Sequence, residues 1–273
     1  MNIAQLQLKK KARQKIVMLT AYDYPTAVYL DKAGVDVILV GDSLANVVLG
    51  LESTTEIGMV EMLHHAKAVT RAVKEAVVIG DMPFESYQID SNKAVANAKL
   101  FIDEAGCDAV KLEWFANCAP VAAAIVASGI PVMGHVGLTP QTAASTGGMK
   151  VQGKDSASAK SIIANAKALE KAGCFAVVLE CIPQEVSKII TDSLLIPTIG
   201  IGAGVHCDGQ VLVTHDLLGL FERYQPKFTK KYVDLGPLMI KAFKEYKNDV
   251  QQGKFPDEAH SFHMPQDEIT KLA

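Results

Sequence analysis

Three segments of the chain resemble one another, and their spacing constrains the fold more than any other feature of the sequence. They span residues 32–42 (KAGVDVILVGD), 104–113 (EAGCDAVKLE) and 171–180 (KAGCFAVVLE). In each segment, Ala-Gly predicts the end of a helix, because glycine adopts the left-handed backbone conformation that closes a helix at little steric cost. The apolar run that follows predicts a strand buried on both faces. Each segment therefore marks a junction between a helix and a strand.

The intervals between these junctions predict further strand–helix units. The glycines Gly34, Gly106 and Gly173 lie 72 and then 67 residues apart, which leaves room for two units in each interval. Four more strand patterns, which make seven in all, occupy residues 15–21, 77–82, 131–136 and 196–202. Helix patterns occupy residues 60–74, 91–105, 117–128, 156–172 and 183–191. An eighth unit falls within residues 210–220, where QVLVTHD fits either a strand or a helix.

Strands that alternate with helices predict an α/β fold with a parallel sheet. Eight units in about 250 residues is the size of a closed (β/α)8 TIM barrel. An open doubly wound sheet is the structural alternative. No linker rich in Ser, Gly or Pro divides the chain, so we expect one domain over residues 1–273. Residues from about 235 to 273 are expected to add a helix near 237–252 and a tail that lies on the barrel or on a neighbouring subunit.

Composition excludes several classes of function. With 27 Lys plus Arg against 30 Asp plus Glu, the formal net charge is −3, so there is no broad basic surface for nucleic acid. No apolar run reaches the length of a transmembrane helix, and no signal-peptide pattern precedes the first strand. The five cysteines form no C-x-x-C pair and suit reduced thiols in a reducing compartment. We therefore expect a soluble cytoplasmic protein without a catalytic cysteine.

Acidic residues stand at the ends of the expected strands, where a parallel barrel places its active site. Asp42, Asp81, Glu113 and Glu180 end four strands, and His135 lies near the end of a fifth. Any one acid alone could be a helix cap or a solvated loop residue. Four carboxylates at equivalent positions would repel one another, which calls for a cation or for raised pKa values.

The residue types favour magnesium. Asp42, Asp81 and Glu113 offer the hard oxygen ligands that Mg²⁺ prefers, and no Cys or His pair is spaced for zinc. Lys111 lies two residues before Glu113 on the same face of its strand, which fits an ion pair, a substrate contact or a Schiff base. The metal, Lys111 and Ser43 could hold a small 2-oxo acid, and Glu180 could remove the proton beside its ketone.

Two glycine-rich patterns in the sequence are candidates for functional loops. Gly200, Gly202 and Gly204 follow a strand, but Val205 stands where a dinucleotide fingerprint needs its third glycine, so a Rossmann site is rejected. Residues 147–153 (GGMKVQG) form a polar, glycine-rich stretch after the fifth strand. This stretch fits a mobile cover over the site or a plain flexible loop.

Taken together, the motifs resemble the ketopantoate hydroxymethyltransferase (3-methyl-2-oxobutanoate hydroxymethyltransferase) family of pantothenate biosynthesis. The resemblance runs in order across about 240 residues, although each motif alone is weak. It rests on residues 20–23 (TAYD), 40–43 (VGDS), 80–84 (GDMPF), 110–113 (VKLE), 134–141 (GHVGLTPQ), 179–181 (LEC), 199–204 (IGIGAG), 215–216 (HD) and 260–262 (HSF).

The resemblance implies a (β/α)8 barrel of the phosphoenolpyruvate/pyruvate type, assembled as a homodecamer. Such an enzyme uses Mg²⁺ and 5,10-methylenetetrahydrofolate to convert 3-methyl-2-oxobutanoate to 2-dehydropantoate. The implied metal ligands or their close partners are Asp42, Asp81 and Glu113, and Glu180 is the implied proton acceptor. The implied substrate-binding residues are Asp42, Ser43, Asp81, Lys111 and His135.

The chain departs from that family at two places, and other enzyme classes share its architecture. Trp114 and Phe115 replace a Gly-rich stretch, and residues 225–231 (QPKFTKK) lack a histidine often found just before them. The main alternative function is a metal-dependent lyase or mutase of the isocitrate lyase/phosphoenolpyruvate mutase type. A Schiff-base aldolase acting through Lys111 is a third possibility, and a barrel that only binds a metabolite is the least favoured.

Overall fold

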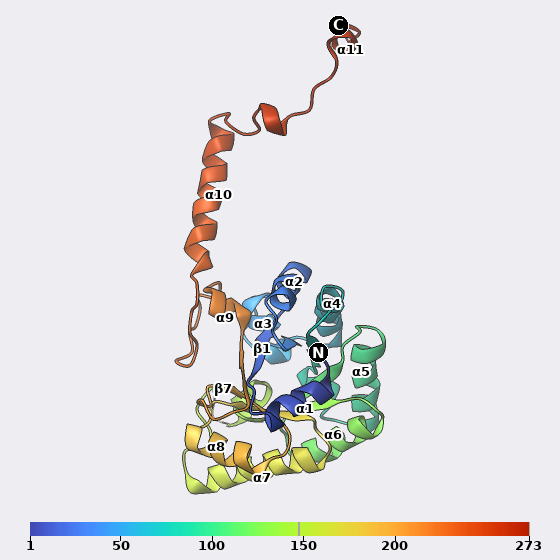
Figure 1. Ribbon diagram of the computed structural model, residues 1–273, viewed down its shortest axis with the longest axis vertical. Coiled ribbons are helices and arrows are strands. Elements are labelled where there is room, and N and C mark those ends of the chain that lie inside the picture. Colours follow the sequence, from blue (N-terminus) through green and yellow to red (C-terminus); the bar gives the residue numbers. More distant parts are fainter. Residues whose placement is uncertain (147, 273) are drawn as a thin grey trace.

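Eight parallel strands close into a barrel in the computed structural model, which describes residues 1–146 and 148–272 (Figure 1). Each strand pairs with the next along the chain, and β1 pairs with β8, so the barrel has no free edge. The TIM barrel is confirmed, and the open sheet is wrong. The strands are β1 (Ile16–Thr20), β2 (Val37–Val40), β3 (Val77–Asp81), β4 (Ala109–Glu113), β5 (Val132–Gly137), β6 (Ala176–Glu180), β7 (Thr198–Ile201) and β8 (Gly209–Leu212).

Helices surround the barrel between these strands, and each expected helix is found with its ends moved by up to four residues. The α-helices are α1 (Ile3–Lys11), α2 (Tyr24–Lys32), α3 (Leu44–Val47), α4 (Met59–Thr70), α5 (Ser91–Asp103), α6 (Cys118–Ala127), α7 (Ser156–Lys171), α8 (Gln184–Ser193), α9 (Thr214–Leu218), α10 (Leu235–Gln251) and α11 (Gln266–Thr270). Short 3-10 turns are η1 (Thr54–Glu56), η2 (Phe84–Ser86), η3 (Pro140–Thr146) and η4 (Glu258–His260).

The repeated Ala-Gly junctions end helices as predicted. Gly34, Gly106 and Gly173 follow α2, α5 and α7 with φ of 75°, 74° and 93°. This is the left-handed region in which glycine carries no Cβ penalty. The chain then turns directly into β2, β4 and β6, so the repeat fixes the start of three strands that carry site residues.

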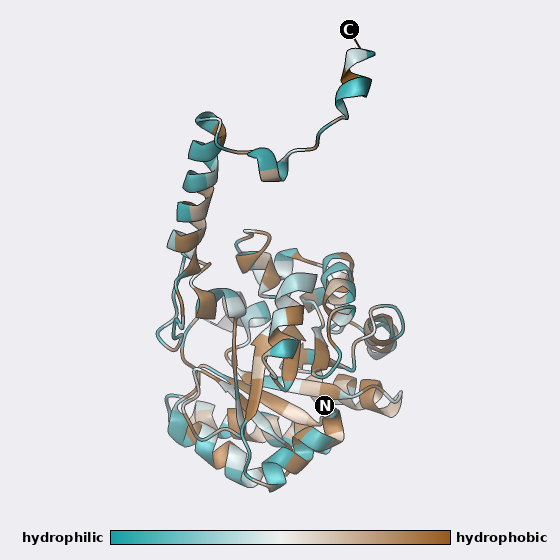
Figure 2. Cartoon of the chain, turned by 45° about the horizontal axis from the view of Figure 1, so that its top comes forward, coloured by the Kyte–Doolittle hydropathy of each residue, from teal (hydrophilic) through white to brown (hydrophobic). Residues whose placement is uncertain are grey.

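Two apolar layers hold the barrel together. Inside it, side chains such as Met18, Ile79 and Val178 fill the space between the strands. Leu6 of α1 is 1% exposed and packs into the same cluster, so α1 covers the amino-terminal mouth of the barrel. A larger cluster lies between the strands and the surrounding helices. Figure 2 shows these apolar strands at the centre, with polar residues on the outer faces of the helices.

The uncertain eighth unit contains both kinds of structure. Its first residues form β8, and its last form α9, with Val213 between them. Thr214 joins α9 to the end of β1: its backbone N–H donates to Thr20 Oγ1 at 3.0 Å. Strand β8 therefore closes the barrel, and α9 follows at the carboxyl end of β8.

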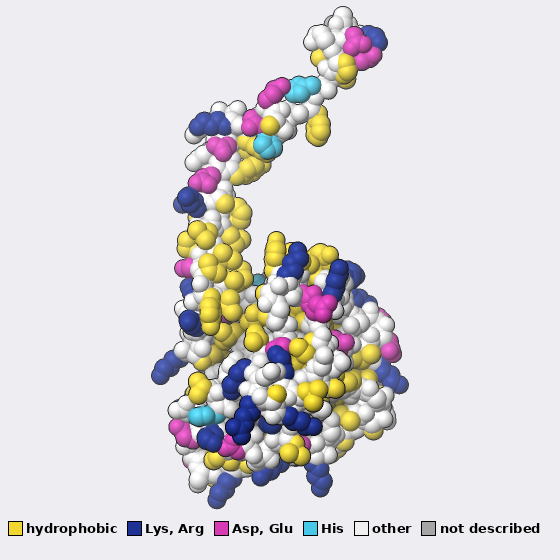
Figure 3. Space-filling view, in the orientation of Figure 1, with side chains coloured by type: hydrophobic (Ala, Val, Ile, Leu, Met, Phe, Trp, Pro, Cys, Tyr) yellow, Lys and Arg dark blue, Asp and Glu magenta, His cyan; other side chains and the backbone are white. Residues whose placement is uncertain are grey.

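The C-terminal helix α10 leaves the barrel instead of packing on it. None of its residues is buried, and it projects from the molecule together with the tail that follows (Figures 1 and 3). The helix expected near residues 237–252 is therefore confirmed. Of the two places expected for the tail, the barrel is excluded, because the irregular residues 220–234 carry the segment away, and a place on a neighbouring subunit stays a prediction. The apolar side chains of α10 stay uncovered, among them Phe243 and Tyr246, which are 63% and 60% exposed.

Two further observations concern membranes and cysteines. Over residues 1–146 and 148–272, no helix has the length and apolar composition to cross a membrane. All five cysteines are free and buried.

Candidate active site

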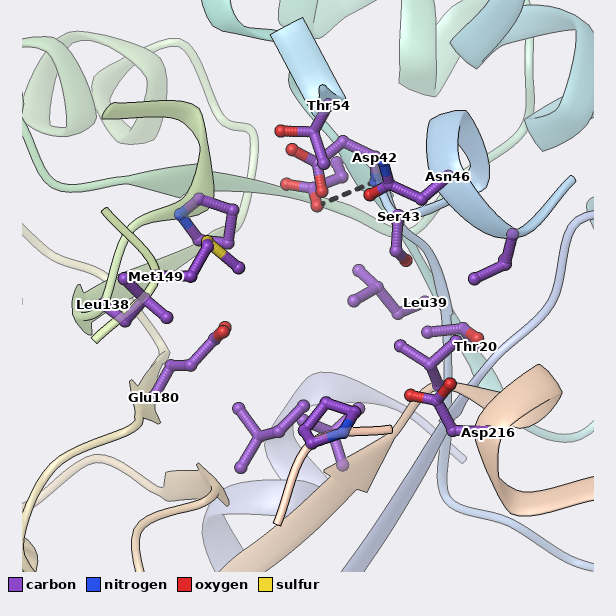
Figure 4. A pocket seen from close by; sticks show the side chains of 18 of the residues that line it. Thr20, Leu39, Asp42, Ser43, Asn46, Thr54, Leu138, Met149, Glu180 and Asp216 are labelled. Carbon is purple, nitrogen blue, oxygen red and sulfur yellow. Dashed lines mark hydrogen bonds between the residues drawn. The ribbon is translucent and has the colours of Figure 1, made fainter. Parts of the chain in front are cut away.

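A cavity of about 480 Å³ opens at the carboxyl ends of the strands, where a TIM barrel places its active site (Figure 4). It is lined by the carboxyl ends of the strands, among them Thr20 of β1, and by residues that follow β2 and β8. All seven residues that the sequence singled out line it, namely Asp42, Ser43, Asp81, Lys111, Glu113, His135 and Glu180. Positions far apart in the chain therefore meet in one space.

Among the predicted site residues, Lys111 is the one side chain that carries a positive charge over a wide pH range. It forms an ion pair with Asp81. Its Nζ lies 2.7 Å and 2.8 Å from the two carboxylate oxygens of Asp81, and 3.8 Å from Glu113 Oε1. Burial opposes the charge of Lys111, but the carboxylates of Asp81, Glu113 and Asp42 together raise its pKa. Lys111 is therefore protonated, and it places a positive charge at the floor of the cavity.

The imidazole of His135 bridges two carboxylates. Its Nδ1 lies 3.4 Å from Glu113 Oε1, and its Nε2 lies 3.3 Å from Glu180 Oε2. Both contacts are longer than an ordinary charge-assisted hydrogen bond, and neither nitrogen has a closer partner among the residues that the structure describes. Glu113 and His135 face each other because they are register partners on β4 and β5.

The two glutamates that flank His135 differ in basicity. Burial acts against the charge of Glu113, but His135, Lys111 and the Gln141 amide outweigh it and lower the pKa of Glu113. Burial, reinforced by the charge of Glu113, instead raises the pKa of Glu180 well above its ordinary value. Glu180 is thus the stronger base, and its side chain points into the cavity (Figure 4).

Gln141 was not singled out by the sequence, yet it links the acidic residues. Its backbone N–H donates to Glu113 Oε2 at 3.0 Å, and its Nε2 donates to Asp42 Oδ2 at 3.0 Å and to the carbonyl oxygen of Met82 at 3.1 Å. The hydroxyl of Tyr87 donates to its Oε1 and accepts from the backbone N–H of Glu113. Gln141 is the last residue of the motif at residues 134–141, and that motif is the sequence signal that pointed to it.

The upper part of the cavity holds the candidate metal ligands. Asp81 Oδ2 accepts from the backbone N–H of Asp42 at 3.2 Å, which keeps the two acids adjacent. Burial raises the pKa of Asp42, as does the charge of Glu113, and burial raises the pKa of Asp81 to about 8 although Lys111 opposes it. Ser43 shares a 2.8 Å hydrogen bond with the Tyr22 hydroxyl.

The predicted three-carboxylate metal cluster is not preassembled. Across the described part of the chain, no three His, Cys, Asp or Glu side chains stand together as a ready metal site. The reason is visible in the contacts: Lys111 occupies both oxygens of Asp81, while Glu113 is turned toward His135 and Gln141. Asp42 and Asp81 are the pair of hard oxygen donors that stay adjacent.

Other residues of the cavity complete its walls. The hydroxyl of Thr54 is buried without a partner among the described residues, and Asp216 of α9 lies across from Glu180 (Figure 4). Met149, from the glycine-rich stretch 147–153, also lines the cavity. Gly147 lies outside the described residues, and the mobile cover stays a prediction.

Comparisons with known proteins agree over nearly the whole chain. The family model described as ketopantoate hydroxymethyltransferase matches residues 1–258. A 3-methyl-2-oxobutanoate hydroxymethyltransferase from Syntrophomonas wolfei is 51% identical over 271 residues, covering 99% of this chain and 98% of that protein. One from Moorella thermoacetica is 54% identical over 261 residues, covering 96% and 97%.

Solved structures confirm the fold at much lower identity. Phosphonopyruvate hydrolase, in a complex with oxalate and Mg²⁺, superposes with a TM-score of 0.62 at 13% identity, covering 100% of this chain and 95% of that one. 2,3-Dimethylmalate lyase, a member of the PEP mutase/isocitrate lyase superfamily, gives 0.58 at 14% identity, covering 99% and 93%. These likenesses show a shared barrel fold.

Proposed function

The chain belongs to the ketopantoate hydroxymethyltransferase family, and from this premise we propose how its cavity works. The reaction transfers a hydroxymethyl group from 5,10-methylenetetrahydrofolate to 3-methyl-2-oxobutanoate and gives 2-dehydropantoate, a step of pantothenate biosynthesis. The observation that carries the proposal is the placement of Glu180, which is partly buried and has a raised pKa, in the same cavity as the Lys111–Asp81 pair. Glu180 can then remove a proton from a substrate anion that Lys111 holds.

The oxo acid binds at the acidic end of the cavity through the cation that the chain provides. Lys111 attracts the substrate carboxylate, and the Ser43 hydroxyl, already oriented by Tyr22, donates a hydrogen bond to it. His135 lies beside this space and limits its depth.

Asp42 and Asp81 fit a divalent cation. Their oxygens are hard donors, and Mg²⁺ is commonly held by one or two carboxylates with water and substrate oxygens completing its shell. Asp42, Asp81 and Glu113 are buried and Glu180 is partly buried, and Lys111 is the one lysine beside these four carboxylates, so a dication would offset the excess of carboxylates. Mg²⁺ supplies Lewis-acid stabilisation of negative charge on the ketone oxygen when bound. Glu113 acts next to that pair by holding Gln141 and His135.

Glu180 takes the proton from C3 of the oxo acid. Burial gives it the raised pKa that a general base near neutral pH needs, and His135 Nε2 lies 3.3 Å from its carboxylate. The resulting C3 enolate forms the new carbon–carbon bond to the methylene carbon of the iminium form of the folate. Water then replaces the folate nitrogen at the methylene carbon: a C–O bond forms as the C–N bond breaks, and the nitrogen keeps the proton that water gives up, so that tetrahydrofolate leaves.

Replacing Glu180 by Gln tests this assignment. Glu180→Gln should abolish exchange of the C3 proton of 3-methyl-2-oxobutanoate in deuterated water, measured by proton NMR, because the amide has no basic oxygen. Binding of the oxo acid, measured by calorimetry, should change less than threefold. The control is Glu185→Gln on α8, which removes one carboxylate outside the cavity. Undiminished exchange in Glu180→Gln would refute the role of Glu180.

The other enzyme classes are less well supported. The lyases and mutases share the barrel at 13–16% identity, whereas the hydroxymethyltransferases match at more than 50% over the full chain. A Schiff base requires a neutral lysine, and the carboxylates around Lys111 keep it protonated.

The proposal extends to assembly and location. The uncovered apolar face of α10 needs a partner, and a second copy of the chain supplies one, with the homodecamer of the family as the expected assembly. The five reduced, buried cysteines fit the cytoplasm.

A further inference from the structure

A further carboxylate, that of Asp216, lines the cavity away from Asp42 and takes no part in the chemistry described above. Asp216 is at the carboxyl end of β8, on α9, and its side chain faces the cavity across from Glu180 (Figure 4). In the described part of the chain, its carboxylate makes no hydrogen bond or ion pair. Burial raises the pKa of Asp216 to about 6, so at neutral pH it is mostly an ionised acceptor.

The walls beside Asp216 are mostly apolar. Arg223 and Tyr224 of the neighbouring segment also line the cavity, and the guanidinium of Arg223 donates to the carbonyl oxygen of Gly50 at 2.8 Å. Val211 and Val213 of the β8 end line this part of the cavity, together with Phe221, Pro226 and Phe228 of the segment that leads away from α9. A flat ring can pack against such side chains, whereas a small charged acid gains nothing from them. The cavity, at about 480 Å³, also exceeds the needs of a small oxo acid and is of the size that holds a drug-sized ligand.

Charge decides which ligand this end takes. An oxo acid anion is repelled by Asp216 and attracted by Lys111 at the other end. A desolvated carboxylate with two free acceptor oxygens fits a neutral ring that presents two adjacent N–H donors, in the paired geometry that carboxylates favour. The 2-amino-4-oxopyrimidine edge of a pterin has this pattern in its N3–H and 2-amino groups.

We propose that Asp216 binds the N3–H and 2-amino edge of the pterin of the folate co-substrate, with the ring packed on the apolar residues beside it. This inference rests on the proposed function, because it names the place of the second substrate of that reaction. The pterin then lies across the cavity from Glu180, with the oxo acid between the ring and the Lys111–Asp81 pair.

The first test measures binding of tetrahydrofolate alone by calorimetry. Loss of a doubly hydrogen-bonded charged acceptor should weaken binding roughly tenfold to a hundredfold in Asp216→Ala, and less in Asp216→Asn, which keeps one acceptor. The matched control is Glu222→Gln, which removes a carboxylate from the same segment but outside the cavity and should leave the affinity unchanged. Equal affinity in all three variants and the unmodified chain would overturn the inference.

The second test uses a folate that lacks the 2-amino group. The unmodified chain should bind 2-desamino-tetrahydrofolate at least tenfold more weakly than tetrahydrofolate, and Asp216→Ala should discriminate less than threefold between the two. Undiminished discrimination in Asp216→Ala would overturn the inference even if its overall affinity falls.

Proton exchange at C3 of the oxo acid separates this inference from the proposed function, because it requires no folate. Exchange by the unmodified chain together with unaltered folate binding in Asp216→Ala overturns only the role of Asp216. Folate binding that depends on Asp216, without any exchange at C3, supports the pterin site and overturns the proposed reaction instead.

Discussion

Gln141 shows how one uncharged side chain can organise a crowded acidic site. Its side-chain amide and its backbone N–H donate to Asp42 and Glu113 at 3.0 Å each, and the Tyr87 hydroxyl donates to its amide oxygen. Replacing it by Leu removes the side-chain donor to Asp42 but leaves the backbone donor to Glu113. The carboxylate of Asp42 is then free to rotate, so we expect Gln141→Leu to bind Mn²⁺ roughly tenfold more weakly, as measured by electron paramagnetic resonance without substrates.

Two variants check this prediction. Gln210→Leu, an exposed glutamine on β8, should leave Mn²⁺ affinity unchanged. Tyr87→Phe should fall between the two, because Gln141 keeps its other contacts. Unchanged Mn²⁺ binding in Gln141→Leu would contradict a positioning role.

Asp216 should make stability depend on pH. Its pKa is about 6 in the folded protein against an ordinary 3.8, so the folded state holds this proton more tightly than the unfolded state does. Its contribution to stability is therefore lost as pH rises from about 4 to 6. In urea titrations, Asp216→Asn should lose less stability than the unmodified chain over that range. Parallel pH profiles for the two proteins would contradict the burial argument.

Most of the site could be predicted at this scale, and the gaps have one physical cause. Asp42, Asp81, Glu113 and Glu180 follow from the rule that the carboxyl ends of parallel strands share one mouth. Gln141 and Tyr87 reach the site from irregular segments and 3-10 turns, where no periodicity tells which way a side chain points. Whether Lys111 pairs with Asp81 or Glu113 depends on atomic distances that strand register alone does not supply.

At the scale of elements, the helix-ending glycines predicted the fold best. Gly34 has φ of 75°, and no atom lies within 4 Å of the position that a Cβ would take. Gly34→Ala would therefore clash with no neighbour, and its cost would come from the left-handed backbone conformation alone. We expect it to lower the free energy of unfolding by about 1–2 kcal/mol in urea titration. Gly34→Asn should cost less, because asparagine tolerates this conformation. Equal costs for the two variants would show that another effect dominates.

The elements that the sequence missed have weak patterns. Helix α1 buries only Leu6, so its sequence lacks an apolar stripe, and its role as a cover for the barrel depends on where that one leucine packs. Residues 210–220 were ambiguous because a short apolar run fits a strand or a helix equally well. Residues 209–212 form a strand because β8 pairs with β1 and so closes the barrel.

At the scale of the whole molecule, α10 stands out because its apolar side chains are exposed to solvent. Apolar side chains gather along it (Figure 3), and a helix of this kind exposed to water is typical of an interface. We expect Phe243→Glu to reduce the molar mass measured by sedimentation while the circular dichroism of the barrel stays unchanged. Asn248→Glu adds the same charge to α10 on another face and should preserve the assembly. An unchanged mass in Phe243→Glu would contradict the interface.

The covered amino-terminal mouth of the barrel has a kinetic consequence. Because α1 closes that mouth and strand side chains fill the interior, the part of the chain that the structure describes leaves reactants a way in and out at the carboxyl end. If the oxo acid binds beside Lys111 and the pterin nearer the opening, as we propose, arrivals are ordered: the acid first, the folate second. Departures reverse that order, so spent tetrahydrofolate must go before the product can escape.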